Sequence, residues 1–418
     1  MVFRMDQLVS SLSHGLDGIE KEAFGVTSNH GRRIALLALA MGRRLGWQEE
    51  DLIGLGACAL LHDNALTEYF LSERPGNAHS MNMKPHCIKG EENAACLPLP
   101  ASAKGVILYH HEHRDGSGAF GLNAAEETPV GAQLIAVADA LDSRMDLRMP
   151  DENSIPLLKA YVEKNRGTFF TVVAADALLS VLDSDLLCRL CDENLDRAFA
   201  EAMPKWEVAL RPAEMMHLGK IVARITDYKS AFTAKHSAQI ANRAHLMARY
   251  YGMDDETCAK VYLAASLHDL GKLLTPLGIL EKPGKLTPDE YAVIQDHVYW
   301  SYIMLKDVEG FEKLCRWAVA HHRKLDGGGY PELPGNFFPL DFISRLMACV
   351  DIYQAVRETR PYHAGRTHRE TMEILWEMAG KGEIDEQITQ DLDTQMAVFT
   401  EDDGDVPDPA LSLAPCNA

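Results

Sequence analysis

Histidine and aspartate residues recur in the C-terminal half of the chain at the ends of apolar segments. His268 and Asp269 follow Leu-Ala-Ala-Ser-Leu, His321 and His322 form a pair, and Asp351 closes the run Met-Ala-Cys-Val. Because apolar residues flank them, we expect these side chains to be buried, and buried imidazole and carboxylate groups need partners. A divalent cation is such a partner, and these ligand types suit iron, manganese or zinc rather than calcium or magnesium.

Two such ions held a few ångströms apart would support hydrolysis of a phosphate diester. An aspartate can bridge two ions, and the pair can bind the phosphate, activate a water molecule and stabilise the leaving oxygen. A single His-Asp dipeptide is usually a local hydrogen-bonded pair or a cap, so the prediction depends on the ordered set as a whole. The set comprises His236, His268, Asp269, His297, His321, His322 and Asp351.

Two neighbouring features could contact an anionic substrate. Lys272 stands three residues after the His-Asp dipeptide, where Gly271 would end the helix and free the lysine, although a lysine there also complements the helix dipole. The sequence Asp-Gly-Gly-Gly-Tyr-Pro at 326–331 follows the double histidine within four residues. Its glycines allow close backbone approach to a ligand, and a plain surface turn would have the same composition.

Most of this pattern occurs a second time, earlier in the chain. In both halves 32 residues separate the first histidine from the His-Asp dipeptide, and 28 or 29 residues separate the double histidine from the last aspartate. Repetition of so many features in one order indicates a tandem duplication. The first copy would use His30, His62, Asp63, His86, His110, His111 and Asp139 as a second metal site.

The first copy lacks the residues that would contact an anion. Leu66 stands in place of Lys272, and Ala119 stands in place of Tyr330. Two interpretations follow: a degenerate domain that binds metal but turns over little, or a second active site with altered specificity. We favour the first, because the missing groups are the anion-contacting ones, and we assign catalysis to the C-terminal copy.

Helical periodicity dominates the chain, and short alternating runs typical of strands are almost absent. Periodic segments lie at 34–45, 51–61, 221–226, 240–250 and 262–267. With 418 residues the chain is long enough for two domains. We therefore predict an all-α protein with two tandem helical bundle domains, residues 1–203 and 204–400. Residues 401–418, rich in aspartate and proline, are predicted to be a flexible acidic tail.

Composition narrows the classes of partner and location. The formal net charge of −20 disfavours a protein that binds nucleic-acid polymers, because that task needs a basic surface. Nine cysteines show no disulfide framework, which favours a reducing compartment. Apolar runs are too short for a membrane span and the N-terminus lacks a signal-peptide pattern. We expect a soluble cytoplasmic protein without a membrane partner.

The order of these motifs resembles the HD-GYP family, metal-dependent phosphodiesterases of cyclic dinucleotides within the HD superfamily. The resemblance implies two divalent ions per active site, iron or manganese, with Asp269 bridging them. One ion would be held by His236, His268, Asp269 and Asp351. The other would be held by His297, His321 and His322. Family members with a third ion carry a glutamate four residues before the first histidine, where this chain has Phe232 and Val26.

The resemblance also implies how substrate is bound and cleaved. Asp269 and Lys272 would be catalytic, with Lys272, Gly329, Tyr330 and Arg360 contacting the substrate. Gln354 departs from the family, which often has aspartate there. The implied reaction is hydrolysis of cyclic di-GMP to linear pGpG and on to GMP. The alternatives are another cyclic dinucleotide such as cyclic GMP-AMP, or a non-catalytic nucleotide-binding scaffold; a homodimer or a signalling protein are the expected protein partners.

Overall fold

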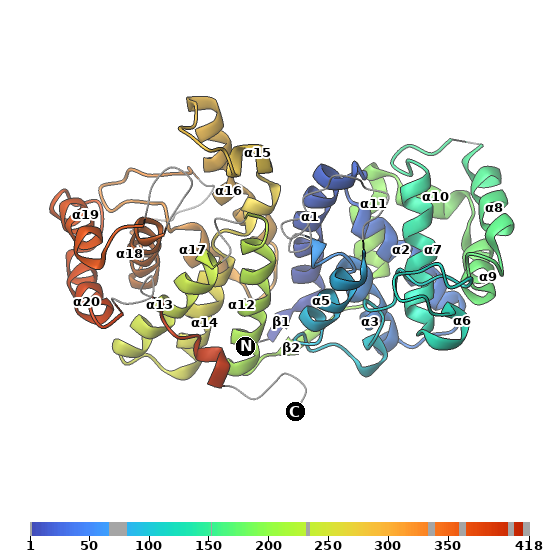
Figure 1. Ribbon diagram of the computed structural model, residues 1–418, viewed down its shortest axis with the longest axis horizontal. Helices are drawn as coiled ribbons and strands as arrows, with labels where there is room; N and C mark the ends of the chain where they lie inside the picture. Colours follow the sequence, from blue (N-terminus) through green and yellow to red (C-terminus); the bar gives the residue numbers. More distant parts are fainter. Residues whose placement is uncertain are drawn as a thin grey trace. The chain divides into compact units, whose positions relative to one another are not determined.

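The computed structural model describes most of the chain, and these residues are mainly helical. The described residues are 2–66, 82–151, 153–230, 235–332, 339–358, 365–399 and 405–412. Within them, strands β1 (Val2–Arg4) and β2 (Glu207–Ala209) pair in a two-stranded sheet (Figure 1). Because the described residues form helices throughout and this one short sheet, the prediction of an all-α protein is confirmed.

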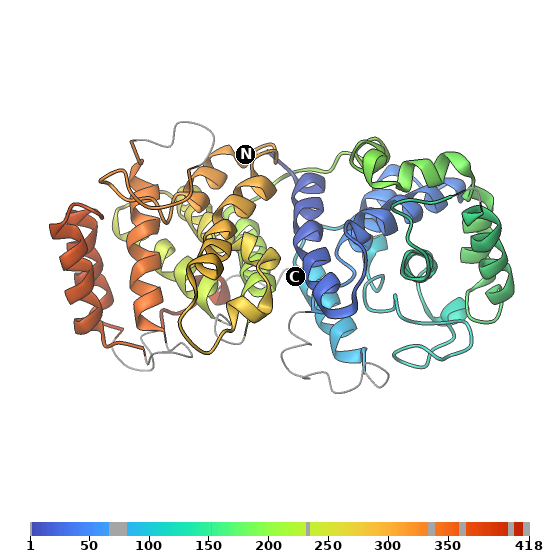
Figure 2. The same cartoon turned by 90° about the horizontal axis from the view of Figure 1, so that it is seen from above.

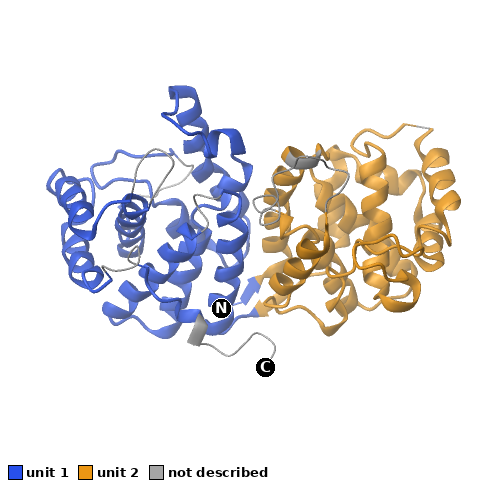
Figure 3. Cartoon of the chain, viewed as in Figure 1, with its two compact units in different colours: residues 1–3, 209–418 blue, residues 4–208 orange. Residues whose placement is uncertain are grey.

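The chain divides into two compact units (Figure 3). The N-terminal unit comprises residues 4–208, and the C-terminal unit comprises residues 209–418 with residues 1–3. This division lies close to the domain boundary expected after residue 203. None of the helices in the described part of the chain is long and apolar enough to cross a membrane.

The N-terminal unit is a bundle of helices. Its helices are α1 (Met5–Phe24), α2 (His30–Arg44), α3 (Glu49–Leu60), α5 (Lys84–Ala94), η2 (Ala101–Ala103), α6 (Ala124–Glu127), α7 (Val130–Arg144), α8 (Ser154–Asn165), α9 (Val172–Val181), α10 (Ser184–Leu190) and α11 (Asp192–Ala202). Helix α2 packs against α3, α7 and α9, so it is central to this unit.

The C-terminal unit is a second helical bundle. Its helices are α12 (Pro212–Asp227), α13 (His236–Tyr250), α14 (Asp255–Leu267), η3 (Leu270–Leu274), α15 (Leu277–Leu280), α16 (Pro288–Leu305), α17 (Glu312–Val319), α18 (Phe342–Arg357), α19 (His368–Gly380), α20 (Glu386–Met396) and η5 (Pro409–Ser412). The last three α-helices pack against one another, with α19 and α20 side by side next to α18 (Figures 1 and 2).

Buried helices lead into both His-Asp dipeptides. Helix α14 packs against α12, α13 and α17, and nearly all of its residues from Cys258 to Leu267 are buried. A helix that is buried all round lies inside its bundle, so His268 and Asp269 emerge in the interior. Helix α3 precedes the first dipeptide in the same way, packing against α1 and α2 and buried from Gly54 to Leu60.

Polar caps fix where the helices of the C-terminal unit begin. Asp254 caps α14 by accepting a hydrogen bond from the backbone N–H of Thr257 at 2.7 Å, and Asp341 caps α18 in the same manner. Helix α16 begins with a reciprocal capping box between Thr287 and Glu290. Such caps satisfy backbone N–H groups that the helix leaves unpaired and so define its first residue.

Part of the predicted tail is packed onto the C-terminal unit. Val406 is 3% exposed, and its backbone N–H donates to Gln239 Oε1 at 2.9 Å. Its carbonyl accepts a hydrogen bond from Asn242 Nδ2 at 3.0 Å. The expectation of a flexible tail over 401–418 is therefore wrong for residues 405–410, because burial of Val406 and its hydrogen bonds to α13 anchor them.

Candidate metal centres

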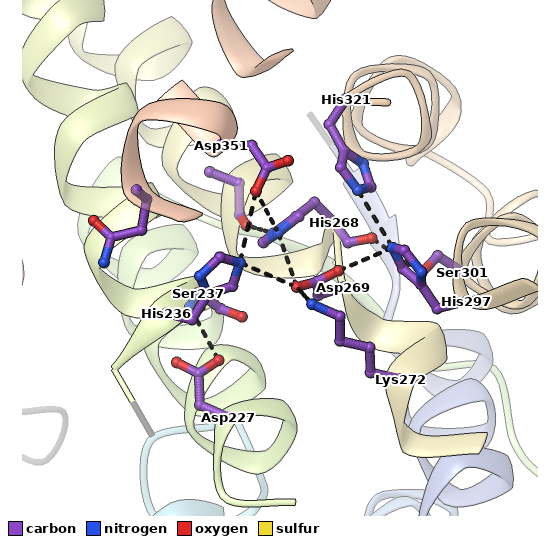
Figure 4. Close-up of polar contacts among 12 residues, drawn as sticks. Asp227, His236, Ser237, His268, Asp269, Lys272, His297, Ser301, His321 and Asp351 are labelled. Carbon is purple, nitrogen blue, oxygen red and sulfur yellow. Dashed lines mark hydrogen bonds and ion pairs between the residues drawn. The ribbon is translucent and has the colours of Figure 1, made fainter. Parts of the chain in front are cut away.

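The seven predicted ligands of the C-terminal copy lie together, although they come from five parts of the chain. Figure 4 shows six of them, all except His322. His236 begins α13, Asp351 lies in α18, and His297 lies in α16. The His-Asp dipeptide follows α14, and the double histidine follows α17. All of these side chains are buried except that of His322, which is 26% exposed.

Asp269 occupies the centre of this cluster. Its Oδ2 atom lies 3.3 Å from His236 Nε2 and 3.1 Å from His268 Nε2. Its Oδ1 atom lies 3.1 Å from His297 Nε2, on the other side of the carboxylate. The two oxygens therefore face two different groups of histidines, which is the arrangement that a bridging carboxylate needs.

The potential ligand atoms fall into three groups in which all atoms lie within 4.8 Å of one another. The groups are His236, His268 and Asp351; His297, His321 and His322; and His268, Asp269 and His321. The first group contains three of the four residues expected for one ion, without Asp269, and the second contains the three expected for the other ion. The third group includes Asp269 and shares one histidine with each of the other two.

Hydrogen bonds orient the histidines for metal binding. His268, His297 and His321 each donate from Nδ1 to the backbone carbonyl three residues earlier, at 2.7, 2.6 and 2.6 Å. A proton on Nδ1 leaves the lone pair of Nε2 directed into the cluster. Within the described residues His268 Nε2 and Asp269 Oδ1 have no hydrogen-bond partner. Buried acceptors without donors fit a cation, so these residues suit the expected ions.

Electrostatics favour the protonation states that ligands require at His321, His322 and Asp269. Burial lowers the pKa of His322 to about 3, and burial with the neighbouring His322 lowers the pKa of His321 well below its usual range. Both imidazoles are therefore neutral near pH 7. Burial pushes the pKa of Asp269 upward, but His268 and Lys272 outweigh it and hold that pKa well below its usual range.

Lys272 contacts Asp269 directly, and its side chain is only 15% exposed. The sequence predicted that this lysine follows a helix end and faces the substrate. In the structure α14 already ends at Leu267, and Lys272 lies in the short helix η3. The ammonium group therefore sits against the carboxylate that is expected to bridge the ions.

Gly271 has a packing role that the sequence did not reveal. A Cβ atom at this position would lie 2.0 Å from the carbonyl oxygen of His297, so only glycine lets η3 approach α16. The backbone N–H of Gly271 donates to Ser301 Oγ at 2.8 Å, and Ser301 Oγ donates to the carbonyl of His268 at 3.0 Å. These contacts hold His297 and His268 in one rigid arrangement.

Glu358 lies at the cluster but belongs to none of the sequence motifs. It accepts a hydrogen bond from His236 Nδ1 at 2.9 Å, and Gln354 Nε2 donates to its other oxygen at 2.6 Å. Burial lowers the pKa of His236, but Glu358 more than compensates and raises it to about 10. The available signal was spacing, because Glu358 follows Asp351 by seven residues, about two helical turns, although it lies just beyond the end of α18.

The glycine-rich loop supports the double histidine. The backbone N–H of Tyr330 donates to the carbonyl of His322 at 3.2 Å, and the two rings have centroids 4.6 Å apart. Gly329 has φ +81°, and a Cβ there would lie 2.0 Å from the same carbonyl. The loop thus covers His322. Arg360 and Phe232 lie outside the described residues.

The N-terminal unit also brings its predicted ligands together. They form two groups. One consists of His30, His62 and Asp139, and the other consists of Asp63, His86, His110 and His111. Asp63 Oδ1 lies 3.0 Å from His86 Nε2 and 3.6 Å from His110 Nε2, so it again faces several histidines. Among the described residues, Nε2 of His62, His86, His110 and His111 lacks a hydrogen-bond partner. This cluster fits cations by the same criterion.

The two clusters differ around the first histidine and the lysine. In the N-terminal unit His30 Nδ1 donates a hydrogen bond at 2.6 Å to Asp142, which stands three residues after Asp139. The C-terminal copy has Gln354 at the equivalent position, and there Glu358 accepts the hydrogen bond from the first histidine. Leu66 is buried where Lys272 would stand. The N-terminal cluster therefore keeps a carboxylate on its first histidine but has no ammonium group at the lysine position.

Together these features define an all-α protein with two buried histidine and aspartate clusters suited to divalent metal ions. The family model described as HD domain matches residues 20–163 and 220–388, one segment in each unit. The chain belongs to the HD domain family.

Several named proteins are similar to this chain. It is 30% identical to 3'3'-cGAMP-specific phosphodiesterase 1 of Vibrio cholerae, over 86% of this chain and 85% of that protein. It is 32% identical to a cyclic di-GMP phosphodiesterase response regulator of Xanthomonas campestris, over 38% of this chain and 43% of that protein. A crystal structure of a cyclic GMP-AMP specific phosphodiesterase of Vibrio cholerae has the same fold, with TM-score 0.63, 22% identity and 99% coverage of both chains.

Proposed function

We propose that the chain is a metal-dependent phosphodiesterase of cyclic dinucleotides and that its C-terminal unit carries out the reaction. The observation that carries this proposal is the buried cluster around Asp269, in which histidine nitrogens and carboxylate oxygens converge and Lys272 contacts the central carboxylate. The relative that matches 86% of the chain is named for this activity, which supports the proposal.

Each residue of the cluster has a proposed role. We assign His236, His268 and Asp351 to one ion, and His297, His321 and His322 to the other. Two divalent ions held by these residues would neutralise phosphate charge and acidify a bound water. Asp269 holds the two groups of ligands together, since its oxygens face both. Lys272 orients Asp269 and adds positive charge that stabilises charge developing on the phosphate.

We further propose that the C-terminal unit belongs to the HD-GYP subgroup. The loop from Gly329 to Tyr330 supports this assignment, because it folds back on His322 at the edge of the cluster. In this proposal Tyr330 and Gly329 line the substrate entrance, and Arg360 binds a substrate phosphate. The domain that carries the reaction runs from residue 204 to residue 400.

Cyclic GMP-AMP is the substrate that we propose. Two Vibrio cholerae relatives named as 3'3'-cGAMP-specific phosphodiesterases match 86% and 72% of the chain. Cyclic di-GMP, the substrate expected from the sequence, is the second candidate, because the Xanthomonas campestris relative is named for it. The broader coverage of the first two relatives favours the mixed dinucleotide.

The N-terminal domain, residues 1–203, is proposed to bind metal but to turn over little substrate. It keeps the buried histidines and aspartates, but Leu66 stands where Lys272 would orient the central carboxylate and Ala119 stands in place of Tyr330. A support or regulatory role for this domain is consistent with those losses.

Hydrolysis assays on the full-length protein test the proposal. Cyclic GMP-AMP and cyclic di-GMP would each be supplied with manganese or with iron, and the linear and mononucleotide products quantified. Asp269→Asn should lower turnover by about 100-fold or more, because it weakens both groups of ligands at once. Asp63→Asn, the matched change in the N-terminal cluster, should lower it far less.

Two outcomes would contradict this assignment. Loss of turnover in Asp63→Asn but not in Asp269→Asn would place the reaction in the N-terminal unit. Absence of hydrolysis of both dinucleotides with both metals would favour the non-catalytic signalling scaffold.

A further inference from the structure

We propose that Glu20 is an additional metal ligand in the N-terminal unit, and that this cluster retains divalent ions more tightly than the C-terminal cluster does. The inference rests on the proposed metal role of the N-terminal histidines and aspartates. It adds a residue that lies outside every motif of the sequence and predicts a difference between the two clusters.

Glu20 projects from α1 into the first group of N-terminal ligands. Its side chain is buried, at 3% exposure, and its Oε2 atom lies 3.8 Å from His30 Nε2. His30 Nε2 lies in turn 3.3 Å from Asp139 Oδ1. Because metal–ligand bonds are about 2.0–2.2 Å long, neighbouring ligand atoms of one ion lie roughly 3 Å apart. Each of these carboxylate oxygens therefore lies near enough to His30 Nε2 to share an ion with it, and Glu20 lies at the edge of the group formed by His30, His62 and Asp139.

The carboxylate of Glu20 has an oxygen that the described protein does not satisfy. Among the described residues, Glu20 Oε2 is buried and has no hydrogen-bond partner. An unpaired buried carboxylate oxygen is costly, and a bound cation is the simplest compensation. The other ring nitrogen of His30, Nδ1, already donates a hydrogen bond to Asp142, so Nε2 is the atom of His30 that is available to an ion.

The N-terminal cluster is also the more negatively charged of the two. Four carboxylates face the histidines of the N-terminal cluster, those of Glu20, Asp63, Asp139 and Asp142, and Arg33 pairs with Asp142. The described part of the C-terminal cluster has three, those of Asp269, Asp351 and Glu358, and Lys272 pairs with Asp269. The formal charges are −4 + 1 = −3 and −3 + 1 = −2. A more negative ligand set binds a dication more tightly, other things being equal.

A cavity gives solvent access to this group of ligands. It has a volume of about 550 Å³, and its lining includes Glu20, His30, Asp63, Asp139 and Arg144. Its carboxylates outnumber its cationic side chains, so the cavity favours cations over a dinucleotide with two phosphates. Ion retention without substrate turnover is the consequence that we infer for the N-terminal unit.

Metal retention by the full-length protein tests the inference without reference to hydrolysis. The protein would be loaded with Mn²⁺ and dialysed against graded concentrations of a chelator, and manganese per chain measured by elemental analysis. Wild-type protein should release manganese in two stages, and the later stage should be absent in Asp63→Asn but present in Asp269→Asn. Glu20→Gln should weaken binding in the later stage by about 10-fold or more, as loss of a ligand or its support typically does.

A matched control and a second measurement separate a ligand role from a folding defect. Glu22→Gln changes an exposed glutamate of the same helix and should retain manganese like the wild type. In chelator, Glu20→Gln should melt at or above the wild-type temperature, because it removes a buried carboxyl group whose Oε2 atom has no hydrogen-bond partner among the described residues. On addition of Mn²⁺ its melting temperature should rise less than that of the wild type.

Three results would overturn the inference. The first is wild-type retention of manganese in Glu20→Gln. The second is a tightly held fraction that disappears in Asp269→Asn rather than in Asp63→Asn. The third is a normal Mn²⁺-induced rise in the melting temperature of Glu20→Gln. Because none of these results depends on hydrolysis, the inference and the proposed phosphodiesterase activity fail separately.

Discussion

The first histidine of each cluster is held by a carboxylate that lies in or just after the helix of the last aspartate. In the N-terminal unit Asp142 of α7 binds His30, and in the C-terminal unit Glu358, the residue that follows the end of α18, binds His236. The supporting carboxylate thus lies three residues after one aspartate and seven residues after the other. Either position brings a carboxylate to the imidazole and can orient it.

Replacement of Glu358 should weaken metal binding without removing a ligand. Glu358→Gln removes the charge that raises the basicity of His236 and should lower metal affinity of the C-terminal cluster by about 10–100-fold. Calorimetric titration with Mn²⁺ in an Asp63→Asn background would measure this affinity. Glu373→Gln, a change at a surface glutamate, is the matched control. An unchanged affinity in Glu358→Gln would mean that the hydrogen bond does not tune the site.

At the scale of elements, close packing of η3 against α16 positions the two halves of the C-terminal cluster. Gly271 lies in η3 and its neighbour His297 in α16, and the histidine of the dipeptide is tied to both through Ser301. The histidines are therefore brought together because the backbones of η3 and α16 pack closely, and not only because their side chains extend toward each other.

Gly271→Ala should separate these two helices. Its Cβ would meet the carbonyl of His297 at 2.0 Å, and such overpacking costs about 1–3 kcal/mol. We expect a lower melting temperature and a loss of bound manganese from the C-terminal cluster. Gly278→Ala in α15, where an added Cβ meets no atom within 4 Å, should leave both unchanged. Equal melting temperatures for the two variants would refute the packing role of Gly271.

At the scale of the whole chain, each unit builds its own cluster, and residues far along the sequence help to complete the C-terminal bundle. Residues 405–412 return to α13 more than 150 residues after it, with Val406 buried against Gln239 and Asn242. Lys220 also binds Asp408 at 2.7 Å. The segment therefore stabilises the helix whose first residue is His236.

Val406→Asp should release this segment. A buried charge without a partner costs several kcal/mol unless the segment detaches, so detachment is the expected response. Thermal denaturation should show a lower melting temperature, and limited proteolysis should cleave the chain near residue 405 sooner. Pro407→Ser, at an exposed neighbour, is the control. Unaltered cleavage in Val406→Asp would show that the segment does not depend on Val406.

The sequence alone determined the helical class, the duplication and the sets of histidines and aspartates that meet in each unit. These features are encoded locally, as apolar periodicity and as spacings that occur twice, so one sequence is enough to detect them. Gly271 and Lys272 could also be singled out in the sequence, but the sequence did not reveal what they contact.

Only the tertiary structure decided which further groups complete the clusters. Glu20 lies ten residues before His30 and on a different helix, and no periodic signal links them; packing of α1 against α2 brings them together. Glu358 replaces an aspartate that the family pattern places at Gln354. Such substitutions preserve a contact while changing its sequence position, because a hydrogen bond depends on where two side chains meet in space and not on their spacing along the chain.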